Sequence, residues 1–166
     1  TWAGLYMSCD DDIKYPPDYE AVMRRWVRRW RGKALVTFHG RVIKPRANHV
    51  NDVVGAYVGC FDNLKEGRWI NYPGSGVMGW DTRLGVPARY EGPLARNNEE
   101  SYLSVWAQQN LVPIFAAPHH KGWLINLNGP DAQALWKEEK ADNWKRPTAV
   151  IVPWAQSHGW AVYDAK

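Results

Sequence analysis

Three tryptophans indicate how this chain is organised, because each precedes an apolar, strand-like run by five residues. The tryptophans are Trp30, Trp106 and Trp144, and the runs begin at residues 35, 111 and 149. Each tryptophan lies near the end of a stretch with helical spacing, so the pattern predicts strand–helix–strand units. We expect helices near residues 17–31, 98–109 and 131–144, and strands near 3–9, 34–39, 53–60, 111–116, 122–127, 148–153 and 158–163. The prediction is three units and a closing strand.

Two of the predicted strand connections are too short to hold a crossover helix. Residues 118–122 and 155–159 each have hairpin length and end in Gly, which favours antiparallel pairing of the strands that they join. Units joined in this way are typical of an α+β fold whose helices cover one face of a mixed, mostly antiparallel sheet, as in ferredoxin-like split βαβ arrangements. A doubly wound α/β sheet is the alternative prediction.

The length of 166 residues predicts a single domain, with one segment that the repeated units do not explain. Residues 62–97 contain six glycines, three prolines, and aromatic side chains interleaved with arginines. An insertion of this length is usually functional or contains secondary structure of its own. Residues 74–79 match the Gly-x-Gly-x-x-Gly spacing of dinucleotide loops, but Pro73 precedes them and no helical pattern follows.

The predicted helix 17–31 has two chemically different faces. Six apolar residues from Tyr19 to Trp30 recur at helical spacing, and five arginines occupy the opposite side. Residues 24–46 carry nine basic side chains and no acid, so we expect the arginines to lack acidic partners one turn away. Such a surface suits phosphates, anionic lipid or an acidic protein. An ordinary solvated helix face would show the same charges.

A short internal repeat places acidic residues after two predicted strands. Residues 4–14 align without gaps on residues 55–65 and share Gly, Tyr, Cys, Asp and Lys. Asp10, Asp11 and Asp12 follow the first strand, and Asp62 occupies the position equivalent to Asp11. Carboxylates at strand ends can hold Mg²⁺ together with substrate phosphates, although Asp is also common in turns. No other cofactor is indicated.

Residues 57–69, Tyr-Val-Gly-Cys-Phe-Asp-Asn-Leu-Lys-Glu-Gly-Arg-Trp, resemble the second half of the motif of GIY-YIG nucleases. The resemblance implies that Tyr57 lies near a scissile phosphate, that Arg68 stabilises this group, and that a glutamate, Glu99 or Glu100, holds one divalent metal ion. The match covers thirteen residues and departs from the family pattern, because Gly67 lengthens the spacing to Arg68 and Pro73 interrupts the helix expected there.

Together these features predict a module that binds a polyanion, with nucleic acid as the favoured partner. The predicted binding residues are Arg24, Arg25, Arg28, Arg29, Arg31, Lys33, Arg68, Trp69, Trp80 and Arg83. One alternative is a metal-dependent phosphodiesterase of nuclease type, using Mg²⁺, with the catalytic candidates Asp11, Asp12, Asp62, Tyr57 and His39. Another is a small-ligand or protein-interaction domain with a pocket lined by Trp.

Nothing in the sequence predicts a membrane span, because the longest apolar run, residues 149–155, is far too short to cross a bilayer. Residues 1–9 lack the basic start and apolar centre of a secretory signal, although a cleaved signal would leave no trace. Cys9 and Cys60 are too few for a disulfide framework. We therefore expect a cytoplasmic rather than a secreted protein, with both thiols reduced and buried.

Overall fold

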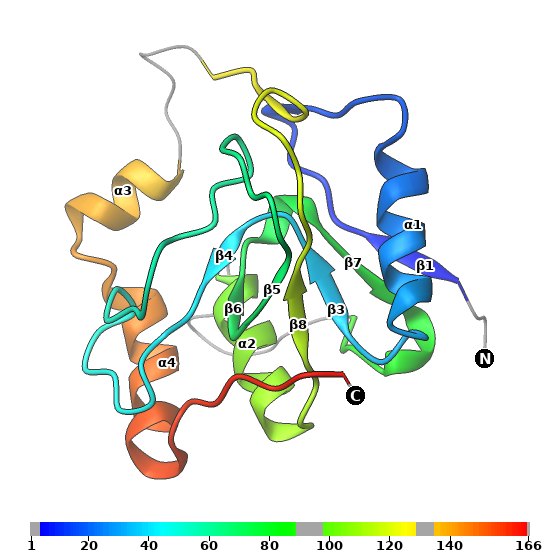
Figure 1. Ribbon diagram of the computed structural model, residues 1–166. Coiled ribbons are helices and arrows are strands. Elements are labelled where there is room, and N and C mark those ends of the chain that lie inside the picture. The colour runs from blue at the N-terminus through cyan, green and yellow to red at the C-terminus, as the bar shows by residue number, and fades with distance from the viewer. Residues whose placement is uncertain (1–3, 89–97, 129–134, 166) are drawn as a thin grey trace.

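A computed structural model describes residues 4–88, 98–128 and 135–165. Within these ranges α-helices surround a central sheet (Figure 1). In chain order the elements are β1 (Leu5–Met7), β2 (Ile13–Lys14), α1 (Tyr19–Arg29), β3 (Leu35–Thr37), β4 (Gly40–Arg41), β5 (Arg68–Ile70), β6 (Tyr72–Pro73), the 3-10 helix η1 (Ser75–Val77), β7 (Met78–Asp81), the 3-10 helix η2 (Thr82–Leu84), α2 (Glu99–Gln109), β8 (Ile114–Ala116), β9 (Ile125–Asn126), α3 (Leu135–Ala141) and α4 (Lys145–His158).

The central sheet has five strands in the order β1-β7-β3-β8-β5. Neighbouring strands are antiparallel except β3 and β8, which run parallel with Leu35 opposite Ile114. Two further antiparallel ladders pair β2 with β9 and β4 with β6. The predicted α+β class with a mixed, mostly antiparallel sheet is therefore confirmed.

The apolar stripe of α1 covers one face of this sheet. Tyr19, Met23 and Val27 recur every four residues and thus share one side of the helix. They are buried in one cluster with Val36 of β3 and Phe115, the middle residue of β8. The helix predicted at residues 17–31 is confirmed, and it runs from residue 19 to residue 29.

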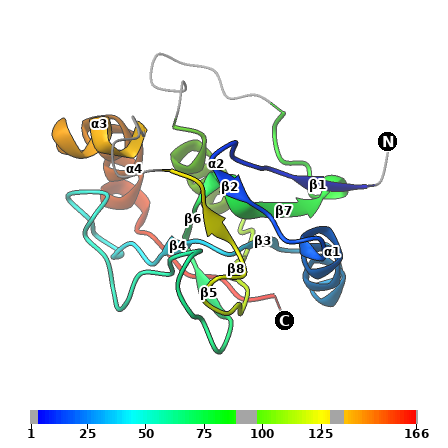
Figure 2. The same ribbon diagram turned by 90° about the horizontal axis from the view of Figure 1, so that it is seen from above.

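The opposite face of the sheet is covered by α2. Leu35 and Ile114 point to this side, one residue away from Val36 and Phe115, because successive side chains of a strand alternate between faces. Leu103 of α2 belongs to the same buried cluster as Leu35 and Ile114. The view from above shows α1 and α2 on opposite sides of the sheet (Figure 2). The helices thus cover both faces of the sheet, whereas we expected them to cover only one face.

Residues 62–97, predicted as an insertion, supply much of the sheet. β5, β6 and β7 lie within this range, and β7 pairs with β1 on one side and β3 on the other. These strands are two to four residues long and are separated by polar residues, Gly and Pro, so the sequence contains no long alternating pattern. Conversely, residues 53–60, predicted as a strand from the internal repeat, contribute only isolated bridges at Val53 and Val58. Residues 89–97 lie outside the described part.

The two strands predicted around residues 148–153 and 158–163 are not strands in the structure. Residues 148–153 belong to α4, and residues 158–163 form no strand. Pro147, Ile151 and Ala155 are buried at a spacing of four, which is helical, and Pro147 is tolerated in the first turn because its missing N–H would have no partner there. A short apolar run does not distinguish a strand from a helix.

The two predicted hairpins are also absent. Residues 155–159 form the end of α4, and the strands on either side of residues 118–122, β8 and β9, do not pair with each other. Instead β9 pairs with β2 near the start of the chain. Of the helix predicted at residues 131–144, the structure describes α3, and residues 131–134 lie outside the described part.

Candidate functional site

The predicted cationic face is exposed along α1 and beyond its end. Its exposed residues are Arg24, Arg25, Arg28, Arg29, Arg31 and Lys33. Arg24 forms an ion pair with Glu20 one turn earlier, which corrects the expectation that these arginines lack acidic partners. Arg29 lies over the rings of Trp26 and Trp30, at 5.5 and 5.6 Å from the ring centres. Among the described residues the other arginines of this face form no ion pair, so the surface keeps most of its charge.

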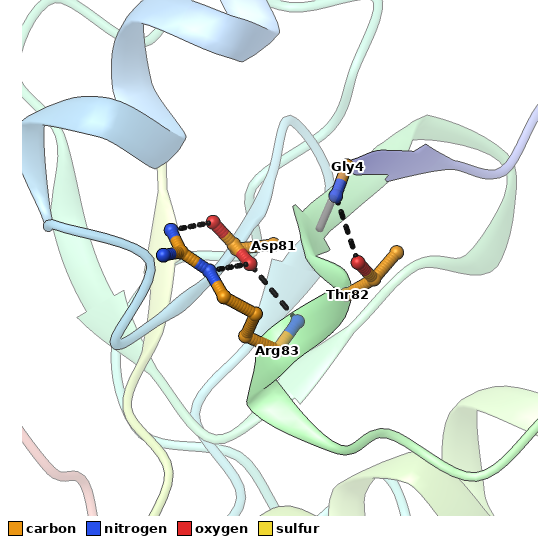
Figure 3. A network of polar contacts seen from close by, with 4 residues as sticks. All are labelled: Gly4, Asp81, Thr82 and Arg83. Atoms are coloured by element: carbon orange, nitrogen blue, oxygen red, sulfur yellow. Dashed lines mark hydrogen bonds and ion pairs between the residues drawn. The ribbon is translucent and has the colours of Figure 1, made fainter. Parts of the chain in front are cut away.

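Arg83, predicted as a binding residue, is paired with Asp81 at the end of β7 (Figure 3). Its Nε donates to Oδ1 of Asp81 at 2.8 Å and its Nη2 donates to Oδ2 at 2.6 Å. These hydrogen bonds from the guanidinium hold the pKa of Asp81 down at about 2. The backbone N–H of Arg83 also donates to Asp81, and Gly4 donates to Thr82 beside them. The charge of Arg83 is therefore largely compensated.

The two tryptophans of the predicted binding loop pack inside the molecule. Trp80 is 8% exposed and stacks on Tyr6, with ring centres 4.1 Å apart. Trp69 is half-buried and contacts the rings of Trp30 and Phe115, at 4.7 and 5.0 Å between centres. Trp69 thus meets the end of the cationic helix, whereas Trp80 is part of the core.

A cavity of about 500 Å³ lies beyond the carboxyl end of β3. Its walls come from the segments after β1 and β3, the residues before β7, the first turn of α2, and the residue before α4. The lining includes the polar residues Asp10, Asp12, His39, Arg41, Tyr57, Cys60, Ser75, Glu100, Asn126 and Asn128, and the aromatic residues Phe61, Tyr72 and Trp144. The volume is in the range of small-molecule sites, about 300–1,000 Å³.

Two glycines of residues 74–79 allow side chains of this cavity to touch the backbone. A Cβ atom at Gly74 would lie 2.2 Å from the His39 ring, and one at Gly76 would lie 1.9 Å from the Asp10 carboxylate. These residues lead into η1 and β7, so the strand-to-helix turn of a dinucleotide loop is absent here. The glycines at positions 74 and 76 therefore leave room for the side chains of His39 and Asp10 to pack against the backbone.

His39 is held in one neutral tautomer. Its Nδ1 accepts a hydrogen bond from the backbone N–H of Cys60 at 3.2 Å, so the ring hydrogen is on Nε2, which donates to the hydroxyl oxygen of Tyr57. Burial and the positive charge of Arg41 lower the pKa of His39 to about 4. His39 is therefore a neutral donor at physiological pH.

Tyr57 lines the cavity and is half-exposed. Because it accepts the hydrogen of His39, it keeps its own O–H to donate to another group. Desolvation raises the pKa of Tyr57 to about 12, so the phenol remains protonated. The backbone beside it is held by Arg68, whose Nη2 donates to the carbonyl of Ala56. The predicted residue Arg68 thus supports the cavity wall.

The guanidinium of Arg41 lies among three aromatic rings. Its central carbon is 4.6 Å from the ring centre of Tyr72, 5.8 Å from that of Trp144 and 5.9 Å from that of Tyr57. Nη1 donates to Asn51 at 2.9 Å. Nε is buried and has no hydrogen-bond partner among the described residues. Leaving a buried donor unpaired costs about 1–3 kcal/mol, more for a charged group, so the position of Arg41 is maintained at a cost in stability.

The ring of Trp144 is positioned by an unusual backbone. Trp144 has φ 53° and ψ 36°, in the left-handed region, and Asn143 before it has φ 54°. A bulky residue in this region is strained by about 1–3 kcal/mol, and such strain is concentrated at functional sites. The N–H of Trp144 donates to the carbonyl of Glu139 at 2.7 Å, which helps to hold the turn.

Glu100 brings a carboxyl group into the cavity from the first turn of α2. Burial raises its pKa to about 7, and the negative charges of Glu99 and Asp10 act in the same direction, while Arg41 and the backbone N–H of Glu100 act against them. Burial also raises the pKa of Asp10, with Asp12 adding to the effect. Arg41 and Glu100 line the same cavity but do not form an ion pair. A group with a pKa near 7 can both accept and release a proton at neutral pH.

Three of the five predicted catalytic residues line this cavity, namely Asp12, His39 and Tyr57. Asp11 is exposed and is not part of the lining, and Asp62 lies beside Gly59, where its charge acts on His39.

Four residues of the site were not among the predicted site residues: Asp10, Arg41, Glu100 and Trp144. Asp10 and Arg41 belong to the acidic run and the basic segment noted in the sequence, but neither pattern distinguishes them from their neighbours. Glu100 was indicated only as one of two glutamates implied by the resemblance to GIY-YIG nucleases, because acidic residues are common in the first turn of any helix and the local pattern does not single it out.

The described residues contain no group of three or more His, Cys, Asp or Glu side chains placed to hold a metal ion. Both cysteines are free, and Cys9 is exposed rather than buried as expected, whereas Cys60 is buried. No helix in the described ranges is long and apolar enough to cross a membrane. No model of a known protein family matches the sequence, and no curated protein matches it.

Proposed function

We propose that the cavity binds a small ligand through an anionic oxygen group, a phosphate or a carboxylate, which is held by Arg41. This proposal is supported by the position of the Arg41 guanidinium, which is fixed among three rings and lines the same cavity as Glu100 without forming an ion pair with it. A charge that is partly removed from water without an opposite charge beside it is destabilised. A ligand placed between the two groups would recover this cost.

The donors on the Arg41 side favour an anion over a cation. The planar guanidinium matches the two oxygens of a phosphate or carboxylate, and the Tyr57 hydroxyl adds a second donor. Glu100 opposes an anion only when it is ionised. Because its pKa is about 7, about half of the molecules carry a neutral Glu100 at pH 7.

Titration calorimetry with inorganic phosphate, adenosine monophosphate and benzoate tests this function. We expect at least one probe to bind. Benzoate keeps the same charge from pH 6 to pH 8, so if it binds it should bind more tightly at pH 6, because ionised Glu100 repels the anion. Arg41→Gln should abolish binding and Arg41→Lys should weaken it. Arg83→Gln, which changes an arginine outside the cavity, is the control. The proposal fails if no probe binds or if Arg41→Gln binds as the unchanged protein does.

A second candidate function is the binding of a polyanion, with nucleic acid as the favoured partner, by the cationic face of α1. It is supported by the exposure of Arg25, Arg28 and Arg31 and by their lack of ion pairs among the described residues. Phosphate contacts release counterions, so affinity for a single strand falls with salt, with a log–log slope of about −0.7 per contact.

Fluorescence anisotropy with labelled single-stranded DNA and RNA, measured over a salt series, tests the second function. Arg25→Gln with Arg28→Gln should weaken binding and reduce the slope by about 1.4, two contacts at about 0.7 each. Lys145→Gln, an exposed change on α4, is the control. Binding to anionic vesicles but not to nucleic acid would contradict a nucleic-acid partner, and absence of both at low salt would contradict the function.

A further inference from the structure

We propose that the cavity is also a hydrolytic site for phosphate diesters, in which Glu100 transfers the proton while Arg41 and Tyr57 stabilise negative charge on the phosphate oxygens. This inference rests on the proposed function, because Arg41 must first hold the phosphate. It adds hydrolysis to the proposed binding and assigns a role in this reaction to Glu100, Arg41 and Tyr57.

The placement of Glu100 is the first support. It lies in the first turn of α2, lines the cavity, and forms no ion pair among the described residues. The charged groups that act on it are Glu99 on its own helix, Asp10 from the segment after β1, and Arg41 from β4. A carboxyl that is not tied to a cation can exchange its proton with a bound water or substrate.

The proton affinity of Glu100 agrees with this role. Burial raises its pKa to about 7, and general acid–base catalysis is most efficient when the pKa of the group is near the working pH. Both protonation states of Glu100 are therefore well populated at neutral pH.

Arg41 and Tyr57, which line the same cavity as Glu100, provide donors for a phosphate transition state. His39 donates to the oxygen of Tyr57, so Tyr57 directs its own O–H elsewhere, and the guanidinium of Arg41 is fixed among three rings. Neither donor has to reorganise during the reaction, because His39 and three aromatic rings hold them in place. Fixed donors directed at developing charge are a large part of catalysis.

The step conserves atoms and electrons. Ionised Glu100 takes a proton from a water molecule, and the water oxygen forms a bond to phosphorus. The bond between phosphorus and the departing oxygen breaks on the opposite side of phosphorus, its electron pair moves to that oxygen, and the oxygen takes a proton from a solvent water. Water and diester become a phosphate monoester and an alcohol, and Glu100 returns to its carboxylate form by releasing its proton to solvent.

Hydrolysis of bis(4-nitrophenyl) phosphate, measured with and without Mg²⁺ from pH 5 to pH 9, tests the reaction. Glu100→Gln should lower kcat about 100-fold or more, the usual loss for a general acid–base group, and should remove the dependence on a group titrating near pH 7. Tyr57→Phe should lower kcat/KM about tenfold or more, because its hydroxyl donates to the phosphate both in the bound state and in the transition state. Glu66→Gln, an exposed change outside the cavity, is the matched control.

Phosphate binding by the same variants separates the two proposals. Gln has the size and neutrality of protonated Glu, so Glu100→Gln should bind inorganic phosphate at pH 6 within about threefold of the unchanged protein. If phosphate binds through Arg41 and the diester is not hydrolysed, or is hydrolysed equally by Glu100→Gln, the hydrolytic role is overturned and the binding function stands. If phosphate does not bind, the hydrolytic role is overturned, and the binding function is overturned as well if adenosine monophosphate and benzoate also fail to bind.

Discussion

Replacing Glu100 by Gln should change how the stability of the protein depends on pH. The pKa of this carboxyl is about 7 in the fold, against an ordinary value of 4.5, because burial penalises the charged form. Between these values the folded state binds more protons than the unfolded state, so the free energy of unfolding falls as pH rises from 4.5 to 7. With each pKa unit worth about 1.4 kcal/mol, the loss is about 2 to 3 kcal/mol after an allowance for partial exposure.

The expected result is therefore a difference that grows with pH. Glu100→Gln should be more stable than the unchanged protein by about 2 to 3 kcal/mol at pH 8, and the two should differ little at pH 4.5. Urea unfolding followed by tryptophan fluorescence measures both free energies. Titrating groups that do not interact with Glu100 contribute equally in both proteins, so their contributions cancel in the comparison.

Two neighbouring variants make the test specific. Glu99→Gln removes a like charge that raises the pKa of Glu100, so it should reduce the loss of stability between pH 4.5 and pH 8. Glu66→Gln changes an exposed acid outside the cavity and should leave the loss unchanged. If Glu100→Gln and the unchanged protein lose the same stability with rising pH, Glu100 is not a buried, uncompensated carboxyl and the reasoning about the cavity fails.

Three further outcomes are expected. NMR titration should show His39 as the Nε2–H tautomer, protonated only near pH 4. A pKa of His39 near the ordinary value of 6.5 would contradict the burial and hydrogen bonding described. Leu103→Ala, at a core position that is 1% exposed, should cost about 2–5 kcal/mol in urea unfolding, and a cost below 1 kcal/mol would contradict the packing of α2. Gly76→Ala should push the Asp10 carboxylate from the cavity wall and lower the pKa of Glu100, as measured by carboxyl NMR; an unchanged value would contradict that contact.

The sequence predicted the elements whose pattern is local and long enough to be unambiguous. α1 repeats its apolar residues over three turns, so one side of the helix could be assigned to the core before the structure was known. α2 and the strands β1, β3 and β8 were located for similar reasons. The cationic face of α1 also follows from the sequence alone, because five arginines opposite an apolar stripe have to face solvent.

Elements whose identity depends on distant partners could not be predicted. β7 is four residues long and includes Gly79, yet it pairs with two strands. Residues 148–153 form an apolar run that suits a strand or a helix equally, and their burial against other elements makes them part of α4. Hydrogen bonds to neighbouring strands and burial against other segments are properties of the assembled chain, not of the local sequence.

The same distinction applies to the site. The sequence alone indicated His39 and Asp12, as polar residues near predicted strand ends, and a set of arginines on an exposed helix face. Tyr57 was indicated by the resemblance of residues 57–69 to the GIY-YIG motif. Only the tertiary structure brought Arg41 and Glu100 to one cavity, since they are separated by many residues and belong to β4 and α2. Burial, the distance between charges and the pKa of a carboxyl depend on what surrounds a side chain, and those surroundings exist only once the chain has folded.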